Sequence, residues 1–105
     1  MRDFMGMMKQ AAQLQSKMQE MQAELDTIEV EGGAGAGLVL VRLTAKGDLK
    51  NVRIDNSLLK DSEKEVLEDL LVAAHADARR KAEAVLAEKM KAMTGGLPLP
   101  PGLLG

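Results

Sequence analysis

The sequence of 105 residues predicts a single domain of the α+β class, with the element order α–β–β–β–α. Segments with helical spacing of apolar residues lie near both ends, and the stretch between them reads as short strands separated by glycine-rich turns. The chain has 8 Met residues but one aromatic residue, Phe4, which weakens the case for a self-sufficient monomer. We therefore expect long N- and C-terminal helices around a three-stranded antiparallel sheet, in a subunit that forms a homodimer.

The first helix is predicted from a heptad repeat. Apolar side chains recur at alternating intervals of three and four residues, at Phe4, Met7, Ala11, Leu14, Met18, Met21, Leu25 and Ile28. This a/d seam is typical of a helix that packs against another helix. Because Gly6 weakens the first turns, we expect the helix to begin near Met7.

Three strands are expected between the helices. A short strand at residues 27–30 enters a turn at Gly32–Gly37. Residues 38–45 are rich in Val and Leu and are apolar on both faces at their start, which favours a central strand. Gly47 then marks a turn, and Leu49–Ile54 returns as the second arm of a hairpin.

A second, longer helix is predicted from Ser62 to Met93, because this run contains no Gly or Pro and opens with the capping-box spacing of Ser62 and Glu65. Its length would be roughly 48 Å. A compact domain of this size has a radius of gyration of only about 13 Å. Since the far half still carries apolar residues, we expect it to lie on another subunit. The domain ends at residue 96, and residues 97–105 form a flexible Pro/Gly-rich tail.

The chain has few residues suited to catalysis or to binding a metal or small molecule. The chain has no Cys and one His, His75, which we interpret as a surface or interface residue of the second helix. A strand, not a helix, follows the glycine-rich segment, so a nucleotide loop is not expected. We therefore predict no enzyme activity, catalytic residue, metal, cofactor or small-molecule substrate. The sequence shows no secretory signal and no membrane-spanning stretch, which predicts a cytoplasmic protein without a membrane partner.

The net charge of −2 argues against indiscriminate binding of polyanions, so any nucleic-acid contact needs a local basic surface. Candidate cations lie on the hairpin and on the second helix: Arg42, Lys46, Lys50, Arg53, Arg79, Arg80 and Lys81. In the alternative interpretation these cations are solvated, with Arg80 and Lys81 paired to Asp77. Candidate dimer contacts are the apolar strand residues Leu38, Leu40, Val41 and Ile54.

Several segments share their order and spacing with one known family. They are Met7–Ala11 through Met21, Val30 with Gly35–Val39, Lys46–Gly47, Val52–Asp55, Leu67–Ala74, Ala78 with Lys81–Ala82, and Leu97–Gly102. Over nearly its whole length the chain thus resembles the YbaB/EbfC family of bacterial nucleoid-associated proteins.

The resemblance implies a tweezer-like homodimer with the sheets at its shared centre. It also implies binding and compaction of double-stranded DNA in the nucleoid, effects on gene regulation, and no enzyme activity. We expect the DNA binding to have low sequence specificity. A homodimeric protein–protein adaptor without direct DNA binding is the alternative that the acidic net charge and the helical seams would also suit.

Overall fold

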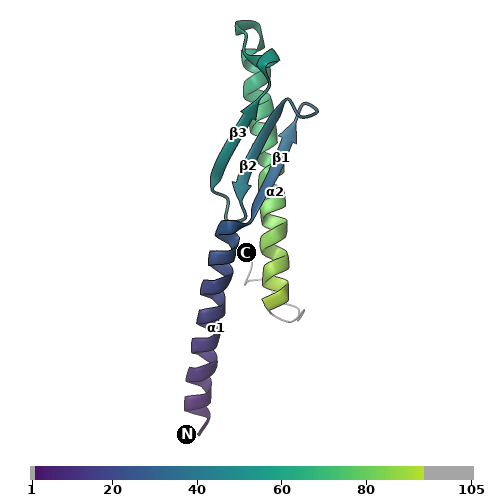
Figure 1. The fold of residues 1–105 in the computed structure, drawn as a ribbon. Helices are drawn as coiled ribbons and strands as arrows, with labels where there is room; N and C mark the ends of the chain where they lie inside the picture. The colour runs from purple at the N-terminus through teal and green to yellow at the C-terminus, as the bar shows by residue number, and fades with distance from the viewer. Residues whose placement is uncertain (1, 94–105) are drawn as a thin grey trace.

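The computed structural model describes residues 2–93 and confirms the predicted order of elements (Figure 1). Three strands form one antiparallel sheet in the order β1-β2-β3, so the second strand is central as predicted. The predicted tail at residues 97–105 lies outside the described residues. The elements are α1 (Arg2–Thr27), β1 (Glu29–Ala34), β2 (Val39–Thr44), β3 (Leu49–Ile54), the short 3-10 helices Asn56–Leu58 and Asp61–Glu63, and α2 (Lys64–Met93).

The main core lies between α2 and one face of the sheet. Val39, Val41 and Leu43 alternate along β2 and are fully buried on this face. They pack with Ala74 and Ala78 of α2, which are also fully buried. Small alanine side chains at these positions let the helix backbone come close to the strands. Helix α2 begins at Lys64 instead of the predicted Ser62, because a 3-10 helix occupies the preceding turn.

Strand β1 passes closest to α2 at Gly32. A Cβ atom there would lie 2.1 Å from the backbone nitrogen of Ala78 and 2.6 Å from the carbonyl oxygen of Ala74. The strand therefore continues through Gly32 to Ala34, and our prediction of a turn beginning at Gly32 is wrong. The turn itself is made by residues 35–37, whose φ angles are 65°, 56° and 91°.

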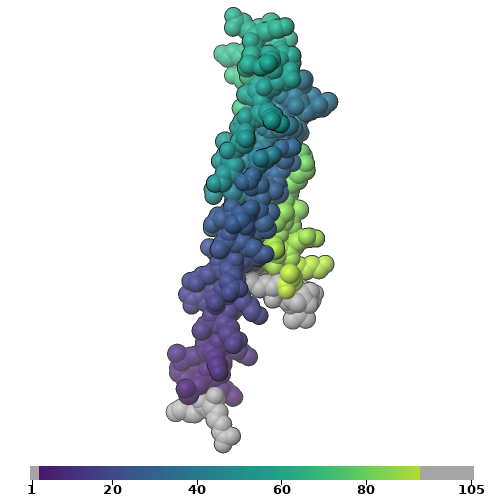
Figure 2. Space-filling view, viewed as in Figure 1, coloured from purple at the N-terminus to yellow at the C-terminus, as the bar shows by residue number. Residues whose placement is uncertain are grey.

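The molecule is elongated, with extents of 72 × 25 × 16 Å and a radius of gyration of 19.5 Å. Helix α1 leaves one end of the sheet and continues beyond the end of α2 (Figures 1 and 2). It begins at Arg2 and runs through Gly6, so the predicted start near Met7 is wrong. A glycine costs a helix about 1 kcal/mol but does not block its backbone hydrogen bonds as proline does.

A second, smaller core joins the two helices below the sheet. Met21 and Leu25 of α1 are buried, and Val85 and Met90 of α2 pack against them. The prediction that the far half of α2 lies on another subunit is thus corrected for these residues, because α1 of the same chain covers them. No helix in the part of the chain that the structure describes could span a membrane.

Candidate nucleic-acid interface

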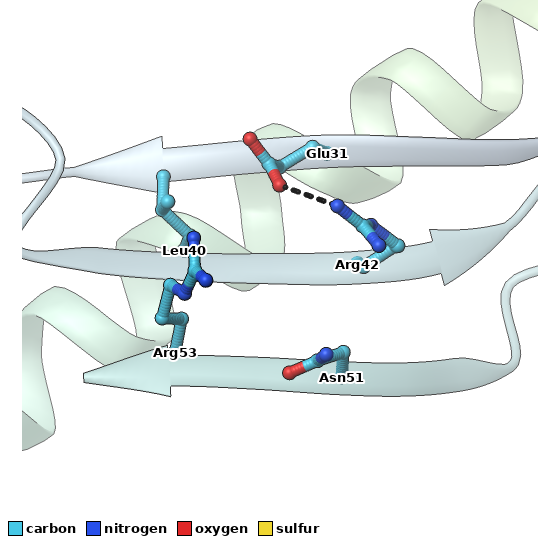
Figure 3. Close-up of a pocket in the computed structure, with 5 residues that line it drawn as sticks. All are labelled: Glu31, Leu40, Arg42, Asn51 and Arg53. Carbon is cyan, nitrogen blue, oxygen red and sulfur yellow. Dashed lines mark hydrogen bonds and ion pairs between the residues drawn. The ribbon is translucent and has the colours of Figure 1, made fainter.

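The outer face of the sheet, opposite α2, carries two of the predicted cations. Pairing of β2 with β3 places Arg53 across from Leu40, and Asn51 across from Arg42. Together with Glu31 of β1 these side chains line a shallow hollow (Figure 3). The outer face of the sheet thus presents two guanidinium groups on the same side.

The two arginines of this face differ in their partners. The Arg42 Nη2 donates to Glu31 Oε2 at 3.2 Å, and its Nε lies 3.7 Å from Glu29 Oε1. Arg53 has no carboxylate partner among residues 2–93, and neither has Lys50 of the same strand. Strand β3 therefore carries the predicted cations whose charge is not neutralised within this part of the subunit.

A second pair of cations meets between the β2–β3 turn and α2. Lys46 of the turn and Arg79 of the helix line the same small hollow. Lys46 Nζ lies 3.3 Å from Asp26 Oδ2, and Arg79 Nη2 lies 3.4 Å from Glu83 Oε1. Exposed pairs of this kind contribute about 0–1 kcal/mol, so a phosphate could displace either carboxylate at small cost.

The remaining predicted cations, Arg80 and Lys81, share Asp77. Their nitrogen atoms lie 3.2 and 3.4 Å from its carboxylate oxygens, so the alternative pairing predicted from the sequence is confirmed. The Asp77 Oδ2 also accepts a hydrogen bond of 3.0 Å from the backbone N–H of Gly33. This bond is the main reason that the pKa of Asp77 lies below its ordinary value.

Helix α2 thereby covers the outer edge of β1. Besides the bond from Gly33 to Asp77, the Lys81 Nζ donates to the carbonyl oxygen of Glu31 at 2.8 Å. Two backbone groups of this edge strand are thus bound by side chains. Sequence reasoning missed the link between Gly33 and Asp77, because the two residues lie 44 positions apart and no local pattern connects them.

Strand β3, by contrast, has an open side. Helix α2 packs over β1 and β2, so Leu49 and Val52 are 59% and 38% exposed on the face that the helix covers elsewhere. Within the described residues no element pairs with the far edge of β3. An apolar groove runs between β3 and α2, and the side chains lining it are Val41, Leu49, Val52, Leu71, Val72 and His75.

The predicted dimer residues lie in three different settings. Val41 is buried in the core of its own subunit and contributes to the groove. Leu38 and Ile54 are partly buried against that core. Leu40 is partly buried on the outer face, beside Arg53 (Figure 3). No sequence pattern indicated the groove as a surface, because its walls come from segments about twenty residues apart.

Comparison with known proteins links nearly the whole chain to one family. The profile described as the YbaB/EbfC DNA-binding family matches residues 1–97. A nucleoid-associated protein of Bradyrhizobium sp. strain ORS 278 is 72% identical over 102 residues, which cover 97% of this chain and 96% of the relative. A nucleoid-associated protein of Nitrobacter winogradskyi is 66% identical over 103 residues, covering 98% of this chain and 97% of that protein.

A solved structure shows the same fold. The crystal structure of the uncharacterized protein HP0035 from Helicobacter pylori superposes with a TM-score of 0.76, covering 85% of this chain and 94% of that one. The two sequences are 22% identical. The similarity therefore concerns the arrangement of the elements.

Proposed function

The chain belongs to the YbaB/EbfC DNA-binding family, and from this premise we propose that it binds double-stranded DNA as a homodimer with low sequence specificity. Its role would be to organise the nucleoid and to influence gene expression there, as a protein of the cytoplasm. The names of its relatives as nucleoid-associated proteins support this location. The observation that carries the proposal is the pair of unneutralised cations on strand β3.

Lys50 and Arg53 are the first candidates for phosphate contact. The net charge of −2 means that attraction to DNA depends on local fields, and a cation beside a carboxylate contributes little to such a field. Both residues are exposed and lack that neighbour within residues 2–93. A guanidinium group can also hold a phosphate through two hydrogen bonds. Phosphate contacts carry no sequence information, which accounts for the low specificity.

The homodimer brings these cations together. We place its contact at the open side of β3, since α2 already covers the edge of β1. Pairing of β3 with β3 of a second copy would cover the exposed Val52 and the adjoining groove of both subunits. Arg53 and Lys50 of both copies would then lie near the shared axis, doubling the local positive charge.

The cations of α2 form the second set of candidates. Arg79 and Arg80 are each paired with a carboxylate of the same helix, yet their side chains are 63% and 70% exposed. They could reach a duplex that lies on the sheet side only by leaving these partners. We therefore expect them to contribute less to the affinity than Lys50 and Arg53 do.

A salt titration of DNA binding tests whether the β3 cations contribute more to the affinity than the α2 cations. Replacing Lys50 and Arg53 by Gln should weaken binding to all duplex sequences alike and flatten the plot of log K against log salt. The slope falls by about 0.9 for each phosphate that the protein no longer neutralises, so four phosphates in a homodimer correspond to roughly 3–4. The matched control is Arg79→Gln with Arg80→Gln, which removes the same charge and should change the slope less.

Two outcomes would contradict the proposal. If the β3 variant keeps the affinity and slope of the parent while its circular dichroism is unchanged, the phosphate contacts lie elsewhere. If the parent protein binds no duplex at low salt, the function itself is refuted and the adaptor interpretation takes its place.

A further inference from the structure

The seam of α1 is occupied at one end and bare at the other. Near the sheet, Met21 and Leu25 are buried against α2. The end of α2 lies beside this part of α1, where Ala92 and Lys17 line a common hollow. Beyond that level none of residues 2–93 covers the heptad repeat at Phe4, Met7, Ala11 and Leu14, and Phe4 and Met7 are 65% and 66% exposed.

We infer that this bare seam binds the same seam of a second copy, with the two α1 helices antiparallel. A repeat with apolar residues every 3.5 positions is matched by another helix and not by a sheet. The seam is also continuous with the helix–helix contact inside the subunit, so a partner helix would extend that contact in line with α2. An antiparallel α1 of the second copy runs in the same direction as α2, and its N-terminal end would lie next to the C-terminal end of α2.

The available length fits this partner and excludes a parallel one. Helix α2 occupies the seam from about Met21 upward, which leaves the stretch below Met18 for a second helix. In the antiparallel arrangement the partner's helix is bare over the same stretch, so neither α2 is in the way. A parallel partner would meet α2 at the upper end of the seam.

The seam residues are complementary in size in this arrangement. Heptad positions a and d face each other in an antiparallel pair. Centring the pair on the bare stretch sets Phe4 opposite Leu14 of the second copy, and Met7 opposite Ala11 of the second copy. Each layer thus combines a larger side chain with a smaller one, which favours close packing.

Charges beside the seam favour the same orientation. Asp3, Gln10 and Lys17 occupy the g positions of this repeat, and g positions of antiparallel helices lie next to each other. Asp3 of one copy would then approach Lys17 of the other, twice by symmetry, while Gln10 meets its own equivalent. Parallel helices would set g against e, where Gln15 and Gln22 offer no charge to pair with.

The consequence is a molecule with two self-complementary surfaces, the bare seam of α1 and the open side of β3. Two different two-fold contacts on each subunit join dimers into larger assemblies. Where such an assembly binds DNA, which rests on the function proposed above, it can hold more than one duplex.

Cysteine cross-linking tests the pairing directly, because the natural chain has no Cys. In the variant Phe4→Cys with Leu14→Cys, mild oxidation should link position 4 of one chain to position 14 of another. A disulfide needs Cα atoms closer than about 7 Å, and the two positions of one helix are roughly 15 Å apart, so the link cannot form within a chain. The control, Met5→Cys with Gln13→Cys, places the thiols away from the seam and should stay uncrosslinked.

Peptide mapping of the linked product decides between the orientations. Disulfides joining 4 to 14 support the inference, whereas disulfides joining 4 to 4 would overturn it in favour of parallel helices. A seam variant that crosslinks no better than the control would overturn the pairing altogether.

Mass measurement gives a second, independent test. Met7→Glu with Leu14→Glu should lower the assembly mass seen by sedimentation equilibrium without unfolding the subunit, because both side chains are exposed. The charge-matched control is Ala12→Glu with Gln19→Glu on the other side of the helix, and it should keep the mass of the parent. Equal masses for the seam variant and the parent would refute the inference. No DNA is present in these tests, so they leave the proposed function to its own experiment.

Discussion

Gly32→Ala is the substitution that should damage this fold most for its size. The added methyl group would lie 2.1 Å from the Ala78 backbone nitrogen and 2.6 Å from the Ala74 carbonyl oxygen. Carbon makes its best contacts at about 3.5–4.0 Å, so β1 and α2 must separate by more than about 1 Å. Neither neighbouring atom belongs to a side chain that could rotate away.

The expected decrease in stability follows from this geometry. Overpacking of a tight core costs typically about 1–3 kcal/mol, and a clash between two backbones should reach the upper end of that range. Separation of β1 from α2 also pulls the Gly33 N–H away from Asp77, which destabilises the fold further. Alanine also lowers the conformational entropy of the unfolded chain, but this offsets only about 0.4–1 kcal/mol of the lost stability. We expect a net destabilisation of about 2–3 kcal/mol.

Thermal unfolding followed by circular dichroism measures the effect. For a domain of this size 1 kcal/mol shifts Tm by about 4–8 °C, so Gly32→Ala should lower Tm on the order of 10–20 °C. Protein concentration must be held constant, because association raises Tm. Gly6→Ala is the matched control: no atom lies within 4 Å of its added Cβ, and Tm should stay equal or rise slightly. If the Tm of Gly32→Ala lies within two or three degrees of the parent, the loss of stability is only on the order of 0.5 kcal/mol and the reasoning is refuted.

Three further outcomes are expected. The folded-state pKa of Asp77 is lowered, so the stabilisation by its carboxylate is present above the unfolded pKa of about 3.9 and is lost as the pH falls through the folded value. In Asp77→Asn, Tm should therefore decrease less steeply at acid pH than in the parent, and an equally steep decrease would contradict this. Val72→Glu, at a position 72% exposed beside the β3 groove, should lower the mass in sedimentation equilibrium with the subunit still folded, whereas Val66→Glu in the first turn of α2, outside the residues that line the groove, should not. Ala36→Gly should raise Tm by a few degrees, since Ala36 holds a φ of 56° that costs a non-glycine residue about 1–2 kcal/mol.

The sequence predicted the fold well where the pattern is local. Periodic apolar residues located both helices, and Gly47, with a φ of 101°, made the predicted turn between β2 and β3. Two of the errors have a common cause in contacts that periodicity does not report. Strand β1 continues through Gly32 because the backbone of α2 lies against it, and the apolar residue Val85 is covered by α1 instead of by another subunit.

The candidate site was less accessible from the sequence. The cations could be named from composition, and the pairing of Arg80 and Lys81 with Asp77 follows from helical spacing. Which cations remain unneutralised could not be foreseen, since Arg42 is balanced by Glu29 and Glu31 of the neighbouring strand. Ion pairs across a sheet depend on strand register, and the sequence alone does not give that register.

The unequal edges of the sheet also limit how strands can add to it. A sheet built from two subunits joined through β3 would present β1 at both of its rims. There the Asp77 carboxylate and the Lys81 ammonium already hold the backbone groups of Gly33 and Glu31. A third chain would find these two backbone groups already bound at either rim, which would disfavour further strand addition there. In such a dimer the same two side chains would oppose the edge-to-edge pairing that leads to fibrous aggregation.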